Sequence, residues 1–240
     1  MKKISFDDLL IFENDDYLIL NKPPHIATLD ERLGTQKSLL ELVREQRPDA
    51  QFGHRLDKET SGAIAVAKHP EAYRHLSIQF EQRRVQKTYH AFVAGVHQFR
   101  ETAVEKNLKT TTNGLARIVP SDEGKPALTY FDTERAFQHV TLLHCRPITG
   151  RLHQIRAHAA YIKAPLVGDP QYGGPLLQLS QIKRGFKLKK HTEEQPLIGR
   201  VALHAAVLAF EGLAGEAIAV QAPYPKDLRA LLRQLEQYDA

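Results

Sequence analysis

The sequence of 240 residues contains one cysteine, one methionine and no tryptophan. The single cysteine, Cys145, excludes an internal disulfide and a cysteine-based metal cluster, so a reducing cytoplasm is the expected location. No run of about 18 apolar residues occurs, and we therefore expect no membrane span. The basic start of the chain is followed by Asp7 and Asp8, which interrupt the apolar region that a signal peptide needs.

The composition is that of a globular protein with a core, since 42% of the residues are hydrophobic and 25% are charged. The formal net charge is +5, and the basic residues are not spread evenly. They gather in the segments 74–87 and 183–191, whereas acidic residues gather at the two ends of the chain. Clustered basic side chains attract phosphates, so we expect a polyanionic partner, with no membrane and no obligate protein partner.

Hydrophobic periodicity predicts a mixed chain in which strands are in the majority. Apolar residues recur at helical spacing in four segments, which are 37–46, 69–84, 150–162 and 225–238. Strand-like segments lie between and around them, at 17–22, 63–68, 85–95, 114–120, 127–137, 139–147, 201–210 and 217–223. This pattern predicts an α+β fold in one continuous domain over residues 1–240. Residues 174–200 fit neither period, and we expect a surface loop or a loose hairpin there.

The stretch HRLDKETSG, residues 54–62, places many polar groups directly before the apolar strand 63–68. Asp57 is the candidate for chemistry, because a carboxylate held beside a buried strand can act as a nucleophile or a base. Thr60 and Ser61 can cap backbone groups of the loop, and Gly62 permits a backbone conformation denied to other residues. The alternative is a well-capped surface loop that carries an Asp–Lys pair.

A second polar concentration, RPITGRLHQIRAHAAYIKAPLVGDPQYGG, contains a helix that we expect to begin at residues 149–150. His153 and Arg156 share one face of this helix, and Arg156 emerges beside its apolar stripe. A guanidinium in that place needs an anion, either Asp57 or a nearby surface acid. His153 and His158 are spaced wrongly for two metal ligands on one face, and no carboxylate or cysteine joins them, so we expect no metal site.

The strand-like segment RRVQKTYHAFVAG carries a third set of polar groups. Strand alternation places Lys87, Tyr89, Ala91 and Val93 on one face and His90 on the other. Tyr89 is then either a core aromatic residue with its hydroxyl at the rim or a residue that meets a ligand.

Taken in this order, the motifs HRLDKETSG, QKTYHAFVAG and TGRLHQIRAH with PLVGDPQYGG resemble the RluA family of pseudouridine synthases. YLILNKPP resembles the opening strand of that family and its Lys-Pro element, and RVALHA resembles the closing strand. The resemblance implies a mixed, mostly antiparallel bent central sheet with flanking helices and an active-site cleft across it. It also implies isomerisation of uridine to pseudouridine in structured ribosomal or transfer RNA, without a cofactor or a metal.

Residue roles follow from the resemblance, motif position by motif position. It implies that Asp57 is the catalytic aspartate, that Arg156 is its basic partner and that Arg55 helps to hold the target base out of the stack. It implies that Tyr89 packs on the flipped base and that Ile155 belongs to the apolar wall behind it. Further RNA contacts are expected from neighbouring polar residues and from the basic segment: His54, Lys87, Arg151, His153, Lys187 and Lys189.

Some features depart from the family pattern or leave alternatives open. The pattern begins by about residue 12, so we expect a stand-alone catalytic domain, without the S4-type domain of many relatives. We also expect a monomer. We expect the basic segment 183–191 to contribute part of the RNA contact. One alternative is a non-catalytic RNA-binding or ribosome-assembly factor with the same fold. Another is a hydrolase that uses Asp57 and Glu59 as an acid–base pair.

Overall fold

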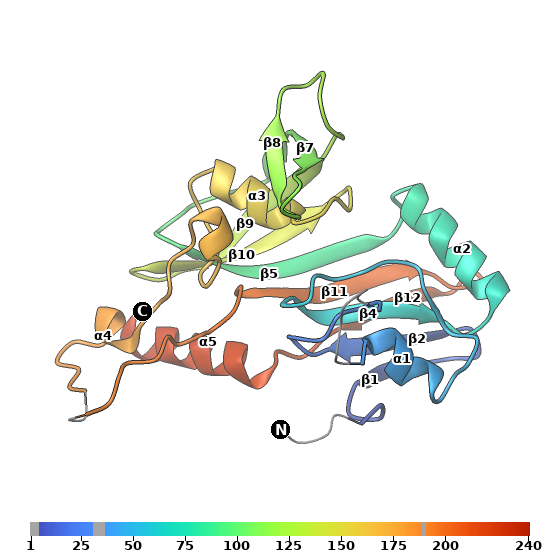
Figure 1. The fold of residues 1–240 in the computed structure, drawn as a ribbon, viewed down its shortest axis with the longest axis horizontal. Helices are drawn as coiled ribbons and strands as arrows, with labels where there is room; N and C mark the ends of the chain where they lie inside the picture. Colours follow the sequence, from blue (N-terminus) through green and yellow to red (C-terminus); the bar gives the residue numbers. More distant parts are fainter. Residues whose placement is uncertain (1–4, 31–36, 189–190) are drawn as a thin grey trace. The chain divides into compact units, whose positions relative to one another are not determined.

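The computed structural model describes residues 5–30, 37–188 and 191–240, which form two compact units (Figure 1). The first unit contains the described residues up to Thr88 and His204–Pro223, and the second contains Tyr89–Leu203 and Tyr224–Ala240. Strand residues exceed helical residues and most strand pairs are antiparallel, which confirms the α+β class. No helix in the described ranges is long and apolar enough to cross a membrane. The single continuous domain stays a prediction.

The first unit is a sheet with two helices. Its strands pair in the order β1-β2-β4-β11, with β3 on β4 and β12 on β11. The pairs are antiparallel except β4 with β11, which is parallel. The elements are β1 (Leu10–Glu13), β2 (Tyr17–Lys22), α1 (Leu39–Arg44), β3 (Gln51–Phe52), β4 (Ser61–Ala67), α2 (Pro70–Glu81), β11 (Leu203–Glu211) and β12 (Ala217–Gln221). Tyr73, Leu76 and Phe80 of α2 pack into the core of this unit, which agrees with the helical spacing predicted for residues 69–84.

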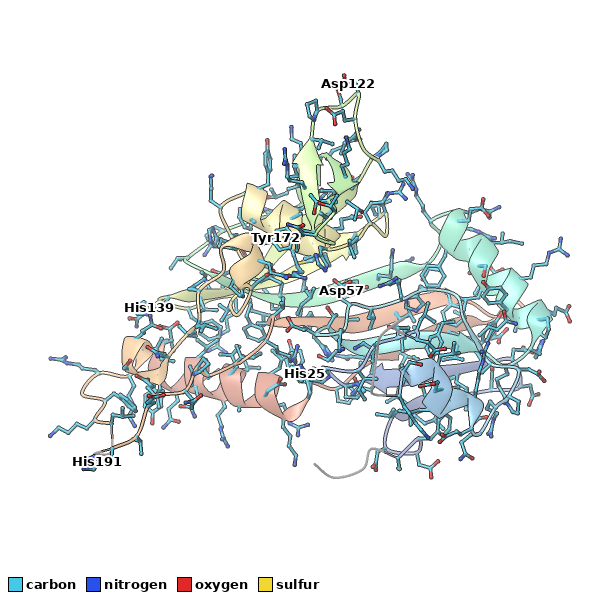
Figure 2. The ribbon with its side chains drawn as sticks, viewed as in Figure 1. His25, Asp57, Asp122, His139, Tyr172 and His191 are labelled. Atoms are coloured by element: carbon cyan, nitrogen blue, oxygen red, sulfur yellow. The ribbon has the colours of Figure 1, made fainter. Side chains whose placement is uncertain are left out.

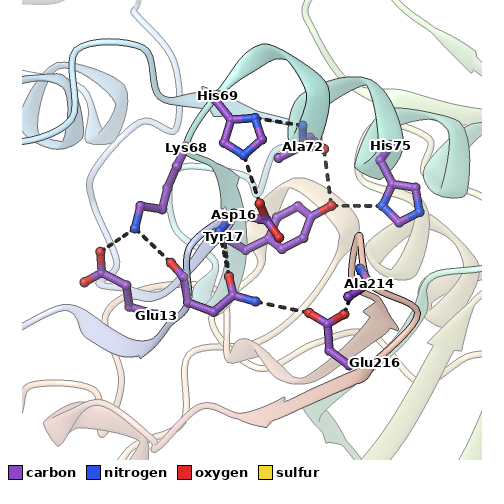
Figure 3. Close-up of polar contacts among 10 residues, drawn as sticks. Glu13, Asp16, Tyr17, Lys68, His69, Ala72, His75, Ala214 and Glu216 are labelled. Carbon is purple, nitrogen blue, oxygen red and sulfur yellow. Dashed lines mark hydrogen bonds and ion pairs between the residues drawn. The ribbon is translucent and has the colours of Figure 1, made fainter.

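A polar network fixes the beginning of α2 (Figure 3). His69 is the N-cap residue, and its Nδ1 accepts the backbone N–H of Ala72 at 3.3 Å. The same ring donates from Nε2 to the carboxylate of Asp16 at 2.9 Å. The hydroxyl of Tyr17 lies 2.9 Å from Nδ1 of His75, and burial raises the pKa of Tyr17 to about 12. The helix therefore begins where a side chain supplies the acceptor that its first N–H groups lack.

The second unit is built on four antiparallel strands in the order β5-β10-β9-β6. A separate hairpin of two strands, β7 and β8, extends beside α3 (Figure 1). The elements are β5 (Gln86–Ala94), β6 (Thr102–Glu105), β7 (Asn107–Thr110), β8 (Ala116–Val119), β9 (Leu128–Ala136), β10 (Val140–Pro147), α3 (Gln154–Tyr161), α4 (Leu179–Ile182) and α5 (Lys226–Tyr238), with a 3-10 turn at Pro170–Tyr172.

Helices cover both faces of this four-stranded sheet. Ala91 and Val93 of β5 belong to a buried cluster with Ile155 of α3. Phe92, between them in the strand, belongs to a different cluster with Leu231 of α5. Since alternate residues of a strand point to opposite faces, α3 and α5 pack on opposite sides of the sheet. The predicted alternation along β5 is confirmed for these residues.

The predicted beginning of α3 at residues 149–150 is wrong, because the helix begins at Gln154. The side chain of Gln154 accepts the hydroxyl of Thr149 at 2.6 Å and the N–H of Arg151 at 3.0 Å, which closes a turn ahead of the helix. His153 is the N-cap residue with a left-handed backbone, φ 48°. The periodicity indicated that His153 shares a helical face with Arg156. This prediction is wrong, because His153 lies before the first turn of the helix.

The described residues of the segment 174–200 are mostly irregular backbone joined by one antiparallel bridge, which agrees with the expected loop or loose hairpin. They include the short helix α4, and the bridge joins Gln178 with Pro196. Ile182 and Ile198 are buried in the cluster that α5 covers. These apolar residues follow no regular period because they pack on α5 from an irregular backbone.

Glycine is required where two backbones touch at Gly168. Its φ is +75°, and a Cβ there would lie 2.1 Å from the carbonyl oxygen of Arg200. Gly173 has a similar φ of +80°, but a Cβ there would meet nothing within 4 Å. The pair separates the cost of a left-handed backbone from the cost of a steric clash.

We expect Gly168→Ala to lower the free energy of unfolding by about 3 kcal/mol or more, because the clash adds to the strain at positive φ. The matched control, Gly173→Ala, carries only the conformational cost, about 1 kcal/mol. Urea denaturation of both variants measures the difference. Equal losses would show that the contact with Arg200 adds nothing.

Candidate active site

Asp57 lies in the loop between β3 and β4, in the first unit (Figure 2). Its side chain is half-buried, while its neighbours Leu56 and Arg55 are buried and exposed. The N–H of Thr60 donates to the carbonyl of Asp57 at 3.0 Å, which forms a turn after the carboxylate. The loop is thus anchored inward at Leu56 and presents charged groups on either side of it.

The buried ammonium of Lys22 helps to fix the backbone of this loop. Lys22 has no exposed surface, and its Nζ donates to three carbonyl oxygens, those of Ile26 at 2.8 Å and of Pro23 and Lys58 at 3.1 Å. The carbonyl of Lys58 also accepts the N–H of His25 at 2.8 Å. A buried cation is costly without such acceptors, so the residue after Asp57 is fixed in place.

A hydroxyl and a ring fasten the first half of the loop. Thr28 Oγ1 donates to the carbonyl of Leu56 at 2.9 Å and accepts its N–H at 3.2 Å. His54 Nε2 accepts the N–H of Ala65 at 3.0 Å, and its ring stacks on Phe80 with centroids 4.5 Å apart. Burial, with a smaller contribution from a lysine charge, lowers the pKa of His54 to about 3, so the ring is neutral at pH 7.

These contacts favour a supporting role for His54 within the protein, and its contact with RNA stays a prediction. Lys87 belongs to the same unit, with its ammonium 6.0 Å from the centroid of the Phe80 ring. Burial lowers the pKa of the Lys87 ammonium to about 8. The Lys87 ammonium therefore loses its proton more readily than that of a solvent-exposed lysine, although it remains mostly charged at pH 7.

Arg156 forms a buried ion pair in the second unit. Its Nε and Nη2 donate to the two carboxylate oxygens of Asp169, each at 2.7 Å, and Nη2 also donates to Gln171 at 2.7 Å. Arg156 is 5% exposed and Asp169 is fully buried. The bidentate geometry fixes the plane of the guanidinium. The expectation that Arg156 needs an anionic partner is confirmed, and its pairing with Asp57 stays a prediction.

Tyr172 connects this ion pair to the hairpin (Figure 2). The guanidinium carbon of Arg156 lies 4.8 Å from the centroid of the Tyr172 ring, within the range of a cation–π interaction. The hydroxyl of Tyr172 accepts the N–H of Ala116 at 2.8 Å and lies 3.0 Å from the carbonyl of that residue, which begins β8. Nδ1 of His153 is 3.0 Å from the same hydroxyl. The side chain of Tyr172 therefore contacts Arg156, the N-cap residue of α3 and the first residue of β8.

A second buried network lies under α3. Gln154 donates from Nε2 to Thr129 Oγ1 at 2.9 Å, and Nδ1 of His158 lies 3.0 Å from that hydroxyl. Nε2 of His158 is 3.3 Å from the carbonyl of Lys106. Burial lowers the pKa of His158 to about 4, so it is a neutral core residue. In the described ranges, no group of three or more His, Cys, Asp or Glu side chains has the arrangement of a metal site.

Tyr89 and Ile155 contribute to one apolar cluster. Tyr89 is the β5 residue paired with Cys145 of β10, and its half-buried ring packs against the cluster that contains Ile155. Ile155, on α3, is 6% exposed. The fold thus brings together the aromatic and aliphatic residues that the sequence assigned to the wall of the base pocket, and their contact with a base stays a prediction.

The predicted site residues fall in both units, and the complete constellation stays a prediction. The first unit holds His54, Arg55, Asp57 and Lys87, and the second holds Tyr89, Arg151, His153, Ile155, Arg156 and Lys187. Arg151 donates from Nε to the carbonyl of Pro126 at 3.2 Å, and Lys187 is exposed. Lys189 lies outside the described residues.

Sequence analysis missed the supporting residues Lys22, Asp169 and Tyr172. Each lies inside a quoted motif, in YLILNKPP or in PLVGDPQYGG, but motif position gives no information about which side chain each one contacts. The only available signal was the requirement of Arg156 for an anion, and Asp169 is thirteen positions away on the far side of a turn.

We expect Asp169→Asn to lower the free energy of unfolding by about 3–5 kcal/mol, because it leaves a buried guanidinium without its bidentate carboxylate. The control is Glu123→Gln, which breaks the exposed pair with Lys109 and costs at most about 1 kcal/mol. Urea denaturation at pH 7 compares the two. Similar losses would mean that other groups balance the charge of Arg156.

Comparison with known proteins identifies the family. A family model described as RNA pseudouridylate synthase matches residues 16–161. The chain is 35% identical to ribosomal large subunit pseudouridine synthase C of Escherichia coli (strain K12) over 98% of this chain and 72% of that protein. It is 36% identical to the protein of the same name from Yersinia pestis, with the same coverage.

Two solved human structures are similar in fold. RNA Pseudouridylate Synthase Domain Containing 1 has a TM-score of 0.70 at 26% identity and covers all of both chains. RNA Pseudouridylate Synthase Domain Containing 4 has a TM-score of 0.72 at 19% identity and covers 96% of this chain and 94% of its own. With the three motifs, the family model and the curated relatives show that the chain belongs to the RluA family of RNA pseudouridine synthases.

Proposed function

We propose that this RNA pseudouridine synthase acts in the cytoplasm on a uridine of large-subunit ribosomal RNA, with Asp57 as its catalytic carboxylate. The observation that carries the substrate proposal is the 35% identity, over 98% of the chain, to enzymes named for the ribosomal large subunit. Transfer RNA is the other substrate that the motifs leave open, and no described feature favours it.

The reaction is an isomerisation, so its atoms balance within the substrate. The C1′–N1 bond of uridine breaks, the uracil turns, and a C1′–C5 bond forms. C5 loses a proton and N1 gains one, so no oxidant, reductant or cofactor is consumed. Asp57 acts on the ribose, either by attack at C1′ or by removal of the C2′ proton. The hydrogen bonds that fix its loop support this role, because a catalytic group must be held in position relative to the reacting carbon.

The target nucleotide has to leave its stack, at a cost of a few kcal/mol. Arg55 is exposed on the loop of Asp57, which suits a side chain that occupies the space left by the base. The base then packs on Tyr89 with Ile155 behind it, since both belong to one apolar cluster. Arg156, oriented by Asp169, is the proposed basic partner of Asp57.

A pocket between the hairpin and the beginning of α3 supports binding of the RNA backbone in the second unit. It has a volume of about 530 Å³, and Lys109, Lys125 and Arg151 line it together with the backbone of Gly124 and Gly150. Three cations around an open pocket suit a phosphate, while the glycines leave room for close approach. Arg184 and Lys187, two exposed cations of the segment 183–191, add to the positive charge of this unit.

The test of the reaction is a map of pseudouridines in ribosomal and transfer RNA from cells that lack the gene. We expect one large-subunit site to disappear, to return with wild type and with the control Glu59→Gln, and to stay absent with Asp57→Ala. Loss of a transfer RNA site instead would overturn the substrate. Restoration by Asp57→Ala would favour the binding-factor interpretation, and failure of Glu59→Gln would favour an acid–base pair.

The proposed phosphate contacts predict a change in salt dependence. We expect Lys125→Ala with Arg151→Ala to reduce the slope of log Kd against log salt concentration by roughly 1.4–1.8, because each phosphate contact contributes about 0.7–0.9. The charge-matched control is Lys226→Ala with Arg229→Ala on α5, both exposed in the same unit. Filter binding to the substrate RNA at several salt concentrations measures both slopes, and an unchanged slope in the first variant would contradict the contact.

A further inference from the structure

A buried serine–histidine pair joins the end of the Asp57 loop to β11. Ser61 is the first residue of β4, and His204 is its partner in the parallel register of β11. Both residues have no exposed surface, and Ser61 Oγ lies 2.9 Å from Nδ1 of His204. The pair therefore lies where the loop that carries Asp57 enters the sheet.

The hydrogen bonds indicate the tautomer of the neutral ring. Nε2 of His204 lies 3.1 Å from the carbonyl oxygen of Ala222, which can only accept a hydrogen bond. Nε2 therefore carries the proton, and Nδ1 accepts the hydroxyl hydrogen of Ser61. The imidazole acts as a rigid link between the carbonyl of Ala222 and the hydroxyl that begins β4.

The next residue makes the same connection through the backbone. Gly62 has φ +118° and pairs with Ala205, and a Cβ at this position would lie 2.2 Å from the carbonyl oxygen of Ala205. The backbones of β4 and β11 therefore leave no room for a side chain at residue 62. Parallel pairing between these strands is confined, in the described part of the chain, to Ser61 and Gly62 with His204 and Ala205.

A serine bonded to a histidine is also the arrangement used for nucleophilic catalysis. That role needs a hydroxyl that a substrate can reach, and Ser61 is fully buried. The second nitrogen of His204 is bonded to a backbone carbonyl instead of the carboxylate that orients a catalytic histidine. The pair is therefore suited to hold the chain in place.

We propose that His204 is a positioning residue for Asp57, which it fixes through Ser61. The inference rests on the proposed role of Asp57. The turn between Asp57 and Thr60 is closed by their backbone hydrogen bond, so a displacement of Ser61 is transmitted to the carboxylate. Lys22 bonds the carbonyl of Lys58 and Thr28 bonds Leu56, and both contacts remain when the Ser61 bond is lost. Loss of that bond thus shifts Thr60 and, through its hydrogen bond, the backbone of Asp57, without unfolding the loop.

Two variants of His204 separate its two hydrogen bonds. Asparagine places an oxygen near the position of Nδ1, so His204→Asn keeps the acceptor for Ser61 and loses the donor to Ala222. Glutamine places an N–H near the position of Nε2, so His204→Gln keeps the donor and loses the acceptor. Ser61→Ala removes the same hydrogen bond from the other side, with the loss of one atom. If His204→Gln does not fold, Ser61→Ala carries the test.

The experiment measures single-turnover rates, the Kd for substrate RNA and thermal midpoints for these variants of the full chain. We expect His204→Gln and Ser61→Ala to lower the single-turnover rate by roughly 30- to 100-fold, with Kd within about threefold of wild type, because a small displacement of a catalytic group affects the rate strongly. His204→Asn is expected to stay within about fivefold, and the double variant of His204→Gln with Ser61→Ala to lose no more than either single variant.

Asp57→Asn is measured beside them to separate two failures. If Asp57→Asn is inactive while folded Ser61→Ala keeps the wild-type rate, the positioning role of His204 is wrong and the role of Asp57 stands. If Asp57→Asn keeps its activity, the proposed function fails first. Rate losses that only follow the thermal midpoints, equal in His204→Asn and His204→Gln, would overturn the positioning role as well.

Discussion

The buried ammonium of Lys22 is the interaction on which the candidate catalytic loop depends. A positive charge without exposed surface is tolerated only where acceptors surround it, and three carbonyl oxygens do so. One of them belongs to Lys58, next to Asp57 in the chain. The requirement of one cation for acceptors therefore fixes the backbone of the residue that follows the carboxylate. Stability of the first unit and placement of its candidate catalytic group have the same physical origin.

The second unit uses buried guanidinium groups in the same way. Arg156 fixes the turn around Asp169 to α3, and Arg200, with 2% of its surface exposed, holds α5 through Asp227 at 2.7 and 3.1 Å. Such pairs contribute little net stability compared with apolar packing, but removal of one partner is expensive. They therefore select one arrangement of irregular segments, which is what a site built on loops requires.

Periodic segments were predictable from the sequence because their signal is local. The helix α2 begins at Pro70 and buries Leu76 as its spacing indicated, and β5 alternates between two clusters at Val93 and Phe92. The beginning of α3 was not predictable, since Gln154 closes a turn with Thr149 that no helical period contains. Residues 174–200 were expected to be irregular, but their packing on α5 was not predictable, because Ile182 and Ile198 are buried from a backbone that follows no period.

The motifs located the candidate site but did not divide its residues between chemistry and support. In HRLD, the ring of His54 bonds the backbone of Ala65, Leu56 is buried, and Arg55 between them is exposed. Neighbours in an extended loop point in different directions, and only the partners of each side chain decide which face it takes. Asp57 is half-buried, between the buried residues that support the loop and the exposed residues that face solvent. The backbone groups beside it are bound by Lys22 and Thr28. A dense polar motif thus serves two purposes. Some neighbours of a reactive carboxylate must fix the chain, and others must face the substrate.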